Sequence, residues 1–567
     1  MKFAYNLFKI IFVFYLVNIG CTEEEYKYKS LSEYGQFAPP DAFEEDSEYA
    51  FYGSENEWNR RMFSENATSK YYKRQGQRQM LEILDGKLDS AIYICKHILE
   101  VQPNDLESYF NLSIAYGQKN QIDSALQYVK LALNNGLPFT RYLAGPRDLL
   151  KPIYQTDYFK ELKERSDIKI IHGLMTGAVT TTGAKVWVRT VNESLVELKL
   201  YKNGKYIDTF SSQSILEDDY STEVNVTGLN PGETYIYKIF VDGKETDGEY
   251  SLETYSETYT DGKITIGFGG GAGYTDKFER MWDTIGKYSP DAFLMMGDNV
   301  YVDLPEMPGA FHNYTYYRRQ SRPEYKRFLQ STNIYAIWDD HDAAIDDIWM
   351  GPYIDKPEWK LPMFRHFEQQ WVNPFNGTDN APGCYFNFPI GEVEFIMLDC
   401  RFYRTNPFKE ERTMLGPDQK VLLKQTLLSS DARVKVIASS VPWSLVAKPG
   451  SKDTWAGFET ERTGIFDFLT ANKIDGVILL SADRHRTDAW KIERENDYPL
   501  YEFQSSRLTN IHTHPVMSGS LIAYNEKCSF GYLTFDFSEN KIVFDIINID
   551  NENEGRVEVS MDELKSS

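Results

Sequence analysis

The sequence predicts a multidomain protein in which an α-helical repeat segment precedes a β-sandwich and an α/β domain. Three patterns support this order. Apolar residues recur with helical spacing over about 75–165, alternate with polar residues over about 168–258, and form short buried runs between helical stretches from about 262 onward. At 567 residues the chain is several times longer than one core requires.

Composition indicates a globular, acidic protein. Hydrophobic residues make up 42% and aromatic residues 15%, which excludes a wholly disordered chain. The net charge of −23 opposes binding to polyanions, so no nucleic-acid-binding domain is expected.

The spacing of the cysteines includes no CxxC pair. Export would permit disulfides, but this spacing does not identify which cysteines would pair. The five cysteines are Cys21, Cys95, Cys384, Cys400 and Cys528.

The N-terminus has the form of a signal peptide, residues 1–20. Two lysines precede an apolar run, and the segment ends in Gly20-Cys21. This ending resembles the lipobox of bacterial lipoproteins, with Asn18 where that motif usually has Leu. The resemblance implies that Cys21 is diacylated and becomes the mature N-terminus. Ordinary secretion with an incidental Cys21 is the simpler alternative.

Residues 21–65 are predicted to be an acidic tether, rich in Glu, Ser and Tyr. The acidic residues after Cys21 resemble the surface-export signals of Bacteroidetes-type lipoproteins. We therefore expect an exported protein that is lipid-anchored to the outer membrane or the cell surface, with the periplasm as the alternative. No other apolar run reaches membrane-spanning length.

Residues 66–165 are predicted to form tetratricopeptide-like helical repeats. The repeat has a period of 34 residues, the tetratricopeptide length. Gly86, Asp89 and Ala91 recur as Asn120, Asp123 and Ala125. Two to three such repeats serve either as a small scaffold or as a docking surface for a protein partner, and the sequence leaves both uses open.

Residues 166–258 are predicted to form a fibronectin-like or immunoglobulin-like β-sandwich. Short alternating strands such as Lys185–Arg189 and Glu197–Tyr201 are separated by turns such as Asn203-Gly204. The segment Leu229–Tyr235 resembles the tyrosine corner of fibronectin-type domains, in which the tyrosine hydroxyl ties down a crossover.

Residues 259–567 are predicted to form an α/β domain whose chemistry lies at strand ends. Four buried apolar runs finish in polar residues. These endings are Gly297–Tyr301, Asp339–Asp342, Asp399–Arg401 and Ser481–His485. Because α/β folds place chemistry at the carboxyl ends of strands, we expect these carboxylates and two imidazoles to meet at one edge.

Clustered carboxylates repel one another and need a compensating cation. A set of carboxylates, imidazoles and a phenolate suits iron, manganese, calcium or zinc. Two ions bridged by one carboxylate would hold a hydroxide nucleophile and clamp a phosphoryl group during in-line attack. Taken singly, each Asp is more simply a loop residue and each His a structural one. The four strand ends together favour a site.

The strand-end motifs resemble those of the PhoD-like alkaline phosphatase and phosphodiesterase family, within the calcineurin-like metallophosphoesterases. Gly297–Tyr301 is similar to GDxxY, a motif also found in purple acid phosphatases. Trp338–Asp342 resembles WDDHE with a final Asp in place of Glu, Leu398–Arg404 resembles LDTRSYR, and Ser481–His485 resembles SGDxH. The resemblance covers about 262–550 and implies a four-layer domain, a β-sandwich flanked by helices.

The resemblance and the residue chemistry together predict a site. The predicted metal ligands are Asp298, Tyr301, Asp340, Asp483 and His485, with Asp298 as the bridge. The predicted catalytic residues are Asp298, Arg401 and His341, the last as the group nearest the leaving oxygen. Asp339 and Asp399 are additional candidates, either as ligands or as orienting residues, and Asn299 is a further candidate ligand. His512 and His514 form an HxH pair that could bind metal, with a role in a substrate loop as the alternative. Candidate substrate-binding residues, for which ion pairing is the alternative, are Arg404, Arg486 and Arg507. The expected cofactors are two or more metal ions, iron and/or calcium first, with manganese or zinc as alternatives.

The first strand departs from the family pattern. In the family it ends in a Ser-Cys pair whose Cys ligates iron, whereas here Ile264–Phe268 runs into Gly269–Tyr274, which offers no such ligand. The glycines would let the backbone approach closely and direct N–H groups at a phosphate, as nests do. The alternative is a tight turn beside a site that has lost one ligand.

These features predict an extracytoplasmic phosphomonoesterase or phosphodiesterase that uses a metal-bound hydroxide. The alternative is a degenerate metallophosphoesterase that acts as a cell-surface binding lipoprotein, which the missing cysteine favours. Sulfatase-like or phospholipase-like hydrolysis by the same centre is a further reading. The expected partners are a phosphate ester, the membrane through the lipid anchor, and a protein bound by the repeats.

Overall fold

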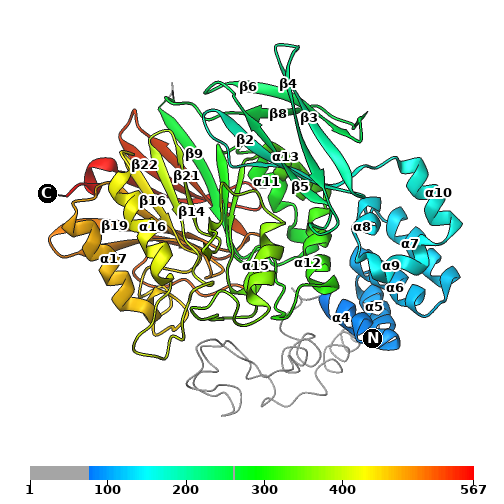
Figure 1. The fold of residues 1–567 in the computed structure, drawn as a ribbon. Coiled ribbons are helices and arrows are strands. Elements are labelled where there is room, and N and C mark those ends of the chain that lie inside the picture. Colours follow the sequence, from blue (N-terminus) through cyan, green and yellow to red (C-terminus); the bar gives the residue numbers. More distant parts are fainter. Residues whose placement is uncertain (1–75, 260–261, 567) are drawn as a thin grey trace, which may run out of the picture.

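The computed structural model describes residues 76–259 and 262–566 (Figure 1). The predicted signal peptide (1–20), the tether (21–65) and the lipidation site Cys21 lie outside the described residues. No described helix combines the length and the apolar character that crossing a bilayer requires. The described cysteines are all buried and carry free thiols: Cys95, Cys384, Cys400 and Cys528.

The N-terminal region is helical, as predicted. Its helices are α4 (Gln77–Leu84), α5 (Leu88–Val101), α6 (Leu106–Gln118), α7 (Ile122–Asn134), α8 (Phe139–Ala144), α9 (Arg147–Tyr154) and α10 (Asp157–Ser166). Helix α7 repeats α5 after the 34 residues of the sequence period, and both bury a small recurring residue, Ala91 or Ala125. These alanines let neighbouring helices approach closely. Membership of the tetratricopeptide class remains a prediction.

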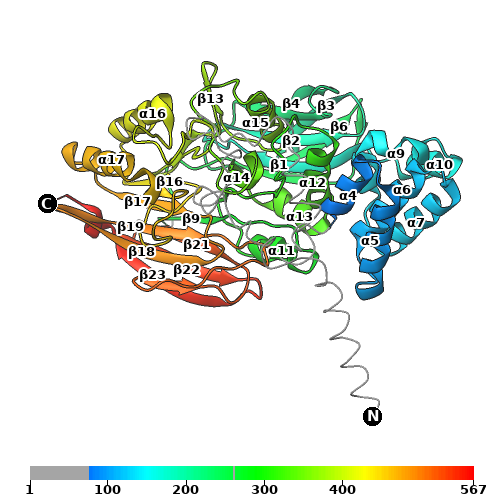
Figure 2. The same cartoon turned by 90° about the horizontal axis from the view of Figure 1, so that it is seen from below.

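One face of the helical region packs against the C-terminal domain (Figures 1 and 2). The rings of Phe110 on α6 and Tyr314 on α12 (Ala310–Gln320) lie 6.4 Å apart. The amide of Asn111 donates to the Tyr314 hydroxyl at 3.4 Å. At the start of α4, the side-chain amide of Gln77 donates to the backbone carbonyl of Tyr301, a predicted metal ligand. The helices therefore support the wall of the predicted site.

Two antiparallel sheets follow. The first has the order β1-β2-β5, and the second β4-β3-β6-β7 with β8 paired to β6. Their strands are β1 (Ile170–Gly177), β2 (Gly183–Thr190), β3 (Ser194–Lys202), β4 (Lys205–Ser214), β5 (Ser221–Thr227), β6 (Thr234–Val241), β7 (Lys244–Glu245) and β8 (Tyr250–Glu253). The backbone N–H of Asn230 donates to the Tyr235 hydroxyl at 3.0 Å, the contact expected of a tyrosine corner. The fibronectin or immunoglobulin class remains a prediction.

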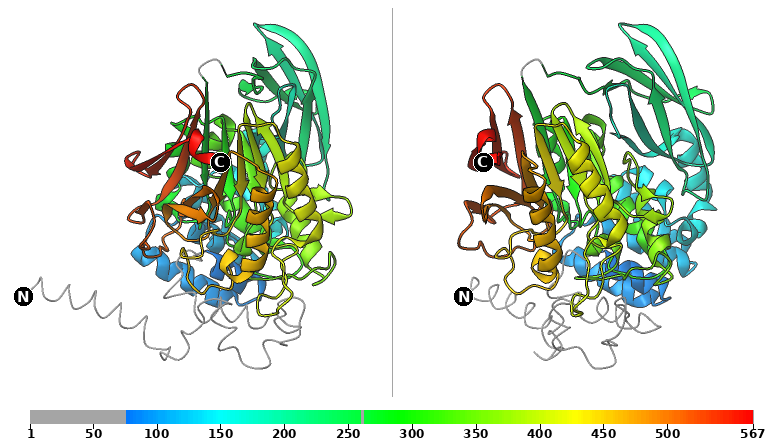
Figure 3. Two further views of the ribbon diagram at one scale, coloured as in Figure 1. Left: turned by 90° about the vertical axis from the view of Figure 1, so that its left-hand side faces the viewer. Right: turned by 60° about the vertical axis from the view of Figure 1, so that its left-hand side comes forward.

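The C-terminal domain contains two larger sheets (Figure 3). One has the order β11-β10-β9-β21-β22-β23. Its strands are β9 (Lys263–Gly269), β10 (Ala292–Met296), β11 (Ile334–Ile337), β21 (Ser529–Asp536), β22 (Lys541–Asn548) and β23 (Asn553–Ser560). The other has the order β14-β15-β16-β17-β19-β18-β20. Its strands are β14 (Phe386–Ile390), β15 (Val393–Met397), β16 (Val434–Ala438), β17 (Val477–Ser481), β18 (Thr487–Arg494), β19 (Asp497–Ser505) and β20 (Ile522–Tyr524).

The two large sheets share an apolar core. Phe395 of β15 lies 6.2 Å from Phe535 of β21, and Phe503 of β19 lies 4.7 Å from Phe544 of β22, measured between ring centroids. Helices α16 (Gly416–Ser429) and α17 (Glu459–Ala471) cover the seven-stranded sheet, and α11 (Met281–Gly286) and α13 (Pro323–Ser331) cover the six-stranded one (Figure 3). This is a helix–sheet–sheet–helix stack. Shorter elements complete the domain: η2 (Asp276–Phe278), α14 (Asp340–Ala343), α15 (Lys360–Glu368), β12 (Gly377–Thr378), β13 (Ala381–Pro382), η3 (Trp455–Phe458) and η4 (Met561–Leu564).

The four predicted polar endings come from both sheets. Strands β10 and β11 are parallel neighbours in one sheet, and β15 and β17 both run parallel to β16 in the other. The expectation of a single sheet edge was therefore wrong. The endings meet because the two stacked sheets bring the carboxyl ends of these strands to the same end of the domain.

Candidate metal centre

Asp298 lies at the centre of the first predicted ligand group. The Tyr301 hydroxyl donates to its Oδ2 at 3.0 Å and lies 3.2 Å from Nε2 of His485. That nitrogen is 3.8 Å from the same carboxylate oxygen. Asp298, Asp483 and His485 all have positive φ angles (53°, 67° and 46°), a sparsely populated conformation for such residues. Backbone strain of this kind clusters at functional sites.

Other carboxylates surround Asp298. Burial raises the pKa of Asp298 well above its ordinary value, and the charges of Asp340, Asp339, Asp342 and Asp483 raise it further. A carboxyl group in this position ionises readily only beside a cation. The position is the one expected of a bridging ligand.

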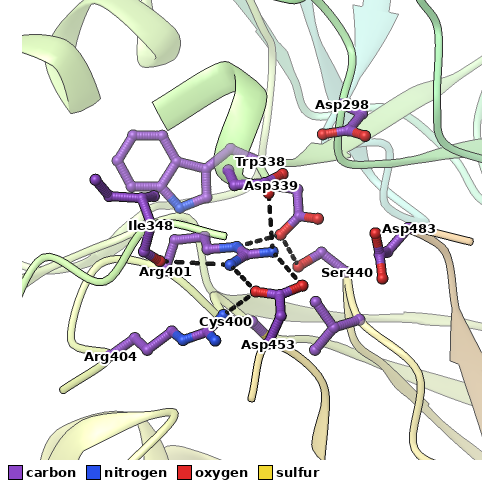
Figure 4. A network of polar contacts seen from close by, with 12 residues as sticks. Asp298, Trp338, Asp339, Ile348, Cys400, Arg401, Arg404, Ser440, Asp453 and Asp483 are labelled. Atoms are coloured by element: carbon purple, nitrogen blue, oxygen red, sulfur yellow. Dashed lines mark hydrogen bonds and ion pairs between the residues drawn. The ribbon is translucent and has the colours of Figure 1, made fainter. Parts of the chain in front are cut away.

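The donor set fits metal ions. Several of its buried oxygen atoms accept no hydrogen bond from any described residue: Oδ1 of Asp298, Oδ1 of Asn299, Oδ2 of Asp339 and Oδ2 of Asp483. Figure 4 shows the carboxylates of Asp298, Asp339 and Asp483 converging. Asp298, Asp340 and His341 also each place one ligand atom within 4.8 Å of the others. Buried oxygens without partners are costly, and hard cations take oxygen ligands of this kind.

Asp339 and Asp340 differ in how their oxygens are used. Oδ1 of Asp339 accepts from Ser440 at 2.7 Å and from Arg401, whereas Oδ2 has no partner among the described residues. Both oxygens of Asp340 accept backbone N–H groups, from His341 at 3.0 Å and from Asp347 at 2.6 Å. Asp339, only an additional candidate in the sequence, therefore offers the more open oxygen.

His341 is oriented by a carboxylate that the sequence did not single out. Its Nδ1 pairs with Oδ1 of Asp303, a fully buried residue, and its Nε2 lies 3.5 Å from Asp346. The ring lies 4.2 Å from that of Tyr301, centroid to centroid. The Asp303 contact fixes the tautomer and the direction of the imidazole, a common arrangement for functional histidines.

Arg401 is fully buried among three carboxylates (Figure 4). It donates to Asp339 and Asp453, and its Nη2 lies 3.7 Å from Oδ2 of Asp340. Arg404, also fully buried, donates to Asp453 at 2.6 Å and to the carbonyl of Lys452 at 2.9 Å. The geometry is that of a buried ion-pair network that holds Asp339 and Asp340 in place. Substrate binding by Arg404 finds no support in this position.

Asp453 neutralises both arginines, and its replacement tests the network. In Asp453→Asn the buried Arg404 loses its carboxylate partner and the buried Arg401 loses one of three, so we expect the free energy of unfolding to fall by about 3–5 kcal/mol. Urea denaturation of the metal-loaded protein measures it. The matched control is Asp562→Asn, which removes an exposed ion pair and should leave the free energy of unfolding close to that of the wild type. Equal stability of both variants would contradict the network.

Asp399 and Asp342 use their carboxylates to organise loops. Oδ1 of Asp399 accepts from the indole of Trp338 and from the backbone of Arg401 and Phe402, each at 2.8 Å, and Oδ2 accepts from the backbone of Cys384. Asp342 accepts backbone N–H groups from Asp339, Asn299 and Val300. Asp399 is therefore placed as an orienting residue, the second of its two predicted roles.

The remaining candidates lie on one flank of the centre. The rings of His512 and His514 are 5.1 and 5.5 Å from that of His485, and one nitrogen of each of the three lies within 4.8 Å of the others. Arg486 donates to Asp488 and to the carbonyls of Pro515 and Ala447. The Arg507 guanidinium donates to the carbonyls of Asn510, Asn525 and Ile511. Both arginines are placed as structural residues that shape the surrounding loops.

The glycine-rich turn after β9 does not form an anion-binding nest. The N–H groups of Gly270, Gly271 and Ala272 donate to the carbonyls of Ser505, Gly297 and Asp298 at 3.0, 3.3 and 2.8 Å. These donors bond to backbone carbonyls at the end of β19 and in the loop after β10, so the hypothesis of an anion-binding nest was wrong. The close approach was predicted correctly. A Cβ at Gly270 would lie only 2.7 Å from the carbonyl oxygen of Gly297.

The raised carboxyl pKa values predict an unusual pH dependence for the metal-free protein. Burial raises the pKa of Asp342 and of Glu502 to about 7, whereas unfolded carboxyl groups titrate near about 4. The folded state then binds more protons between these values, so the free energy of unfolding should fall as the pH rises from about 5 to about 8. Denaturation of the chelated protein measures this fall. Added metal should flatten it, and a rise over this window would contradict it.

Three residues of the site were missed in the sequence. They are Asp303, Asp453 and Asn510. The amide of Asn510 donates to the Tyr301 hydroxyl at 2.7 Å. Asp303 stands two residues after the GDxxY segment and could have been included with it. Asp453 lies in a loop away from the four strand-end motifs, and Asn510 stands two residues before the candidate His512, but no local signal marks either side chain as part of the site.

Comparisons with known proteins match two parts of the chain. The family model "PhoD-like phosphatase" matches residues 266–566, and "Domain of unknown function (DUF7800)" matches residues 167–256. Alkaline phosphatase D of Bacillus subtilis (strain 168) is 21% identical over 313 residues, which are 47% of this chain and 53% of that protein. The chain thus spans about half the length of this curated relative. A solved structure, "Structure of PhoD", has a TM-score of 0.58 at 16% identity, covering 68% of this chain and 88% of the other.

Proposed function

Because the chain belongs to the PhoD-like phosphatase family, we propose that it is a metal-dependent phosphoric ester hydrolase that acts outside the cytoplasm. The observation that carries the proposal is the convergence of Asp298, Tyr301 and His485 beside buried carboxylate oxygens that no described residue satisfies. A purely structural role does not explain these oxygens, because buried acceptors without a partner among the described residues are costly.

The residues supply two groups of ligands around a shared carboxylate. Asp298, Tyr301 and His485 would hold one ion, and Asp298, Asp340, Asp483 and the open oxygens of Asp339 and Asn299 would hold another. The ions, iron or calcium first and manganese or zinc as alternatives, would supply an activated water and positive charge for the phosphoryl oxygens. Tyr301 supports this assignment, because burial and Asp298 raise the pKa of its hydroxyl and a phenolate there needs a cation.

Other side chains of the protein have separate roles in the proposed reaction. His341, fixed by Asp303, donates a proton to the leaving oxygen. Arg401 acts as a positioning residue, since it is fully buried and its guanidinium is engaged by Asp339 and Asp453. The Gln77 contact keeps the Tyr301 backbone in place from the helical side.

Metal analysis and hydrolysis of aryl phosphates test this proposal. We expect the purified protein to retain at least one metal ion per chain and to hydrolyse an aryl phosphate monoester or diester. Chelation should abolish turnover, and a divalent ion should restore it. A protein without bound metal or turnover under any ion would be the degenerate, ligand-binding form. The glycine turn, which lacks a first-strand ligand, favours that second candidate.

Location and partners extend the proposal. The signal-peptide pattern and Cys21 suggest a lipoprotein of the outer membrane or cell surface. Labelling with a radioactive fatty acid, lost in Cys21→Ala, tests the anchor. The outer side of the helical region exposes Tyr93 and Val101 by 71% and 66%, which offers apolar contact area to a protein partner.

A further inference from the structure

Arg484 carries a buried guanidinium that donates no hydrogen bond to any residue that the structure describes. It sits between the candidate ligands Asp483 and His485, and its side chain is 9% exposed. No guanidinium nitrogen of Arg484 donates to another described residue, and Nε is fully enclosed. Its nearest charge is Oδ2 of Asp483 at 3.7 Å from Nη1, which is too long for a hydrogen bond. The five N–H donors of this guanidinium thus lie beside the candidate metal ligands without a hydrogen bond to any described residue.

The neighbouring Arg486 shows that the chain can satisfy a buried arginine at this depth. Arg486 is 1% exposed, and all three of its guanidinium nitrogens donate, to Asp488 and to two backbone carbonyls. Each guanidinium nitrogen of Arg486 therefore has an acceptor, whereas Arg484, two residues away, has none among the described residues. A buried donor left unpaired costs about 1–3 kcal/mol, and more when it is charged. The missing acceptor of Arg484 is best supplied by a bound anion.

Lys448 provides a second cation on the same flank. It lies in the loop after β16, and its Nζ is 3.5 Å from Oδ1 of Asp347. The backbone N–H of Asp347 in turn donates to Asp340. Lys448 and Arg484 are the two strongest cationic influences on Asp483. Both cations therefore border the candidate metal ligands, in a protein whose net charge is −23.

We propose that Arg484 and Lys448 form an anion subsite at the metal centre that selects phosphate monoesters over diesters. The proposal rests on the proposed hydrolase function and names its substrate class. A monoester carries a terminal phosphate dianion, whereas a diester carries one negative charge and a second ester group. A planar guanidinium matches two phosphate oxygens, and the ammonium adds a point charge. The second ester group of a diester would replace the oxygen that these cations bind.

The test compares p-nitrophenyl phosphate with bis(p-nitrophenyl) phosphate in the metal-loaded full chain. In Arg484→Gln we expect kcat/KM for the monoester to fall by about 10- to 100-fold and that for the diester by less than about 3-fold. Lys448→Met should act in the same direction, and Arg484→Lys should recover part of the loss. Lys424→Met, an exposed lysine on α16, is the charge-matched control and should change neither rate. Equal losses with both esters would overturn the proposal.

Binding of inorganic phosphate tests the anion subsite independently of catalysis. Titration calorimetry of the metal-loaded protein should show phosphate binding that weakens by about tenfold or more in Arg484→Gln and in Lys448→Met. If the wild type hydrolyses neither ester, the proposed function fails, while this titration still decides the subsite. Unchanged phosphate affinity in both variants would refute it. If Arg484→Gln does not fold, as judged by thermal unfolding, Lys448→Met carries both measurements, because its side chain is 22% exposed.

Discussion

Replacing Asp298 by asparagine is expected to lower kcat/KM by about 10²- to 10³-fold or more while leaving the fold intact. Asparagine keeps the size of the side chain but removes the charge that two ions would share. Metal content per chain should fall in parallel. The metal-free variant should unfold at the same temperature as the metal-free wild type or higher, because one charge leaves a crowded carboxylate cluster.

Asp399→Asn is the contrasting control for that experiment. Its carboxylate accepts only N–H groups of the protein, so the amide should cost stability while metal content and turnover per folded molecule stay close to wild type. The two variants therefore separate a loss of metal from a loss of folding. If the Asp298→Asn protein retained full activity and full metal content, Asp298 would not be the bridging ligand.

His341→Asn should also lower turnover strongly, and the size of the loss should depend on the leaving group. A proton donor contributes about 10²- to 10⁴-fold to general acid catalysis. With an alkyl phosphate, whose alkoxide leaves poorly, we expect a loss in this range. With p-nitrophenyl phosphate the leaving phenolate needs no proton, so the loss should be about tenfold or less. Steady-state kinetics on both substrates measures the difference.

Asp303 gives a graded version of the same test. In Asp303→Asn the imidazole keeps its place but loses the carboxylate that orients it. We expect a smaller fall than in His341→Asn with the same bias toward poor leaving groups. Equal losses on alkyl and aryl substrates in both variants would exclude His341 as the proton donor and leave it a structural residue.

The domain order and the strand-end residues were predictable because both depend on local patterns. Apolar periodicity distinguished the helical region from the sheets, and each buried run of the α/β domain ended where a strand of the structure ends. Asp298, Tyr301 and His485 were found at strand ends in this way, and the resemblance of their motifs to those of the family gave their roles. The stacking of the two sheets then brought them together.

The partners of the charged residues were not predictable. Arg401 and Arg404 follow a strand end, as a substrate-binding pair would, yet Asp453 neutralises both from about fifty positions further along the chain. The glycine turn had the same ambiguity. Its N–H groups bond the carbonyls of the neighbouring loops, which no local pattern specifies. Long-range contacts decided both cases.

The contact between Gln77 and Tyr301 joins residues 224 positions apart and has a consequence for how the chain folds. The N-terminal helices are synthesised first, but the surface against which α4 and α6 pack exists only after α12 and the loop that follows β10 have formed. Such separations slow folding, because a long loop must close before the contact is made. Because the two regions share this buried interface, the helical region and the C-terminal domain should unfold in one transition. A fragment starting at residue 259 would expose the face around Tyr314 and lose the contact that holds the backbone of Tyr301.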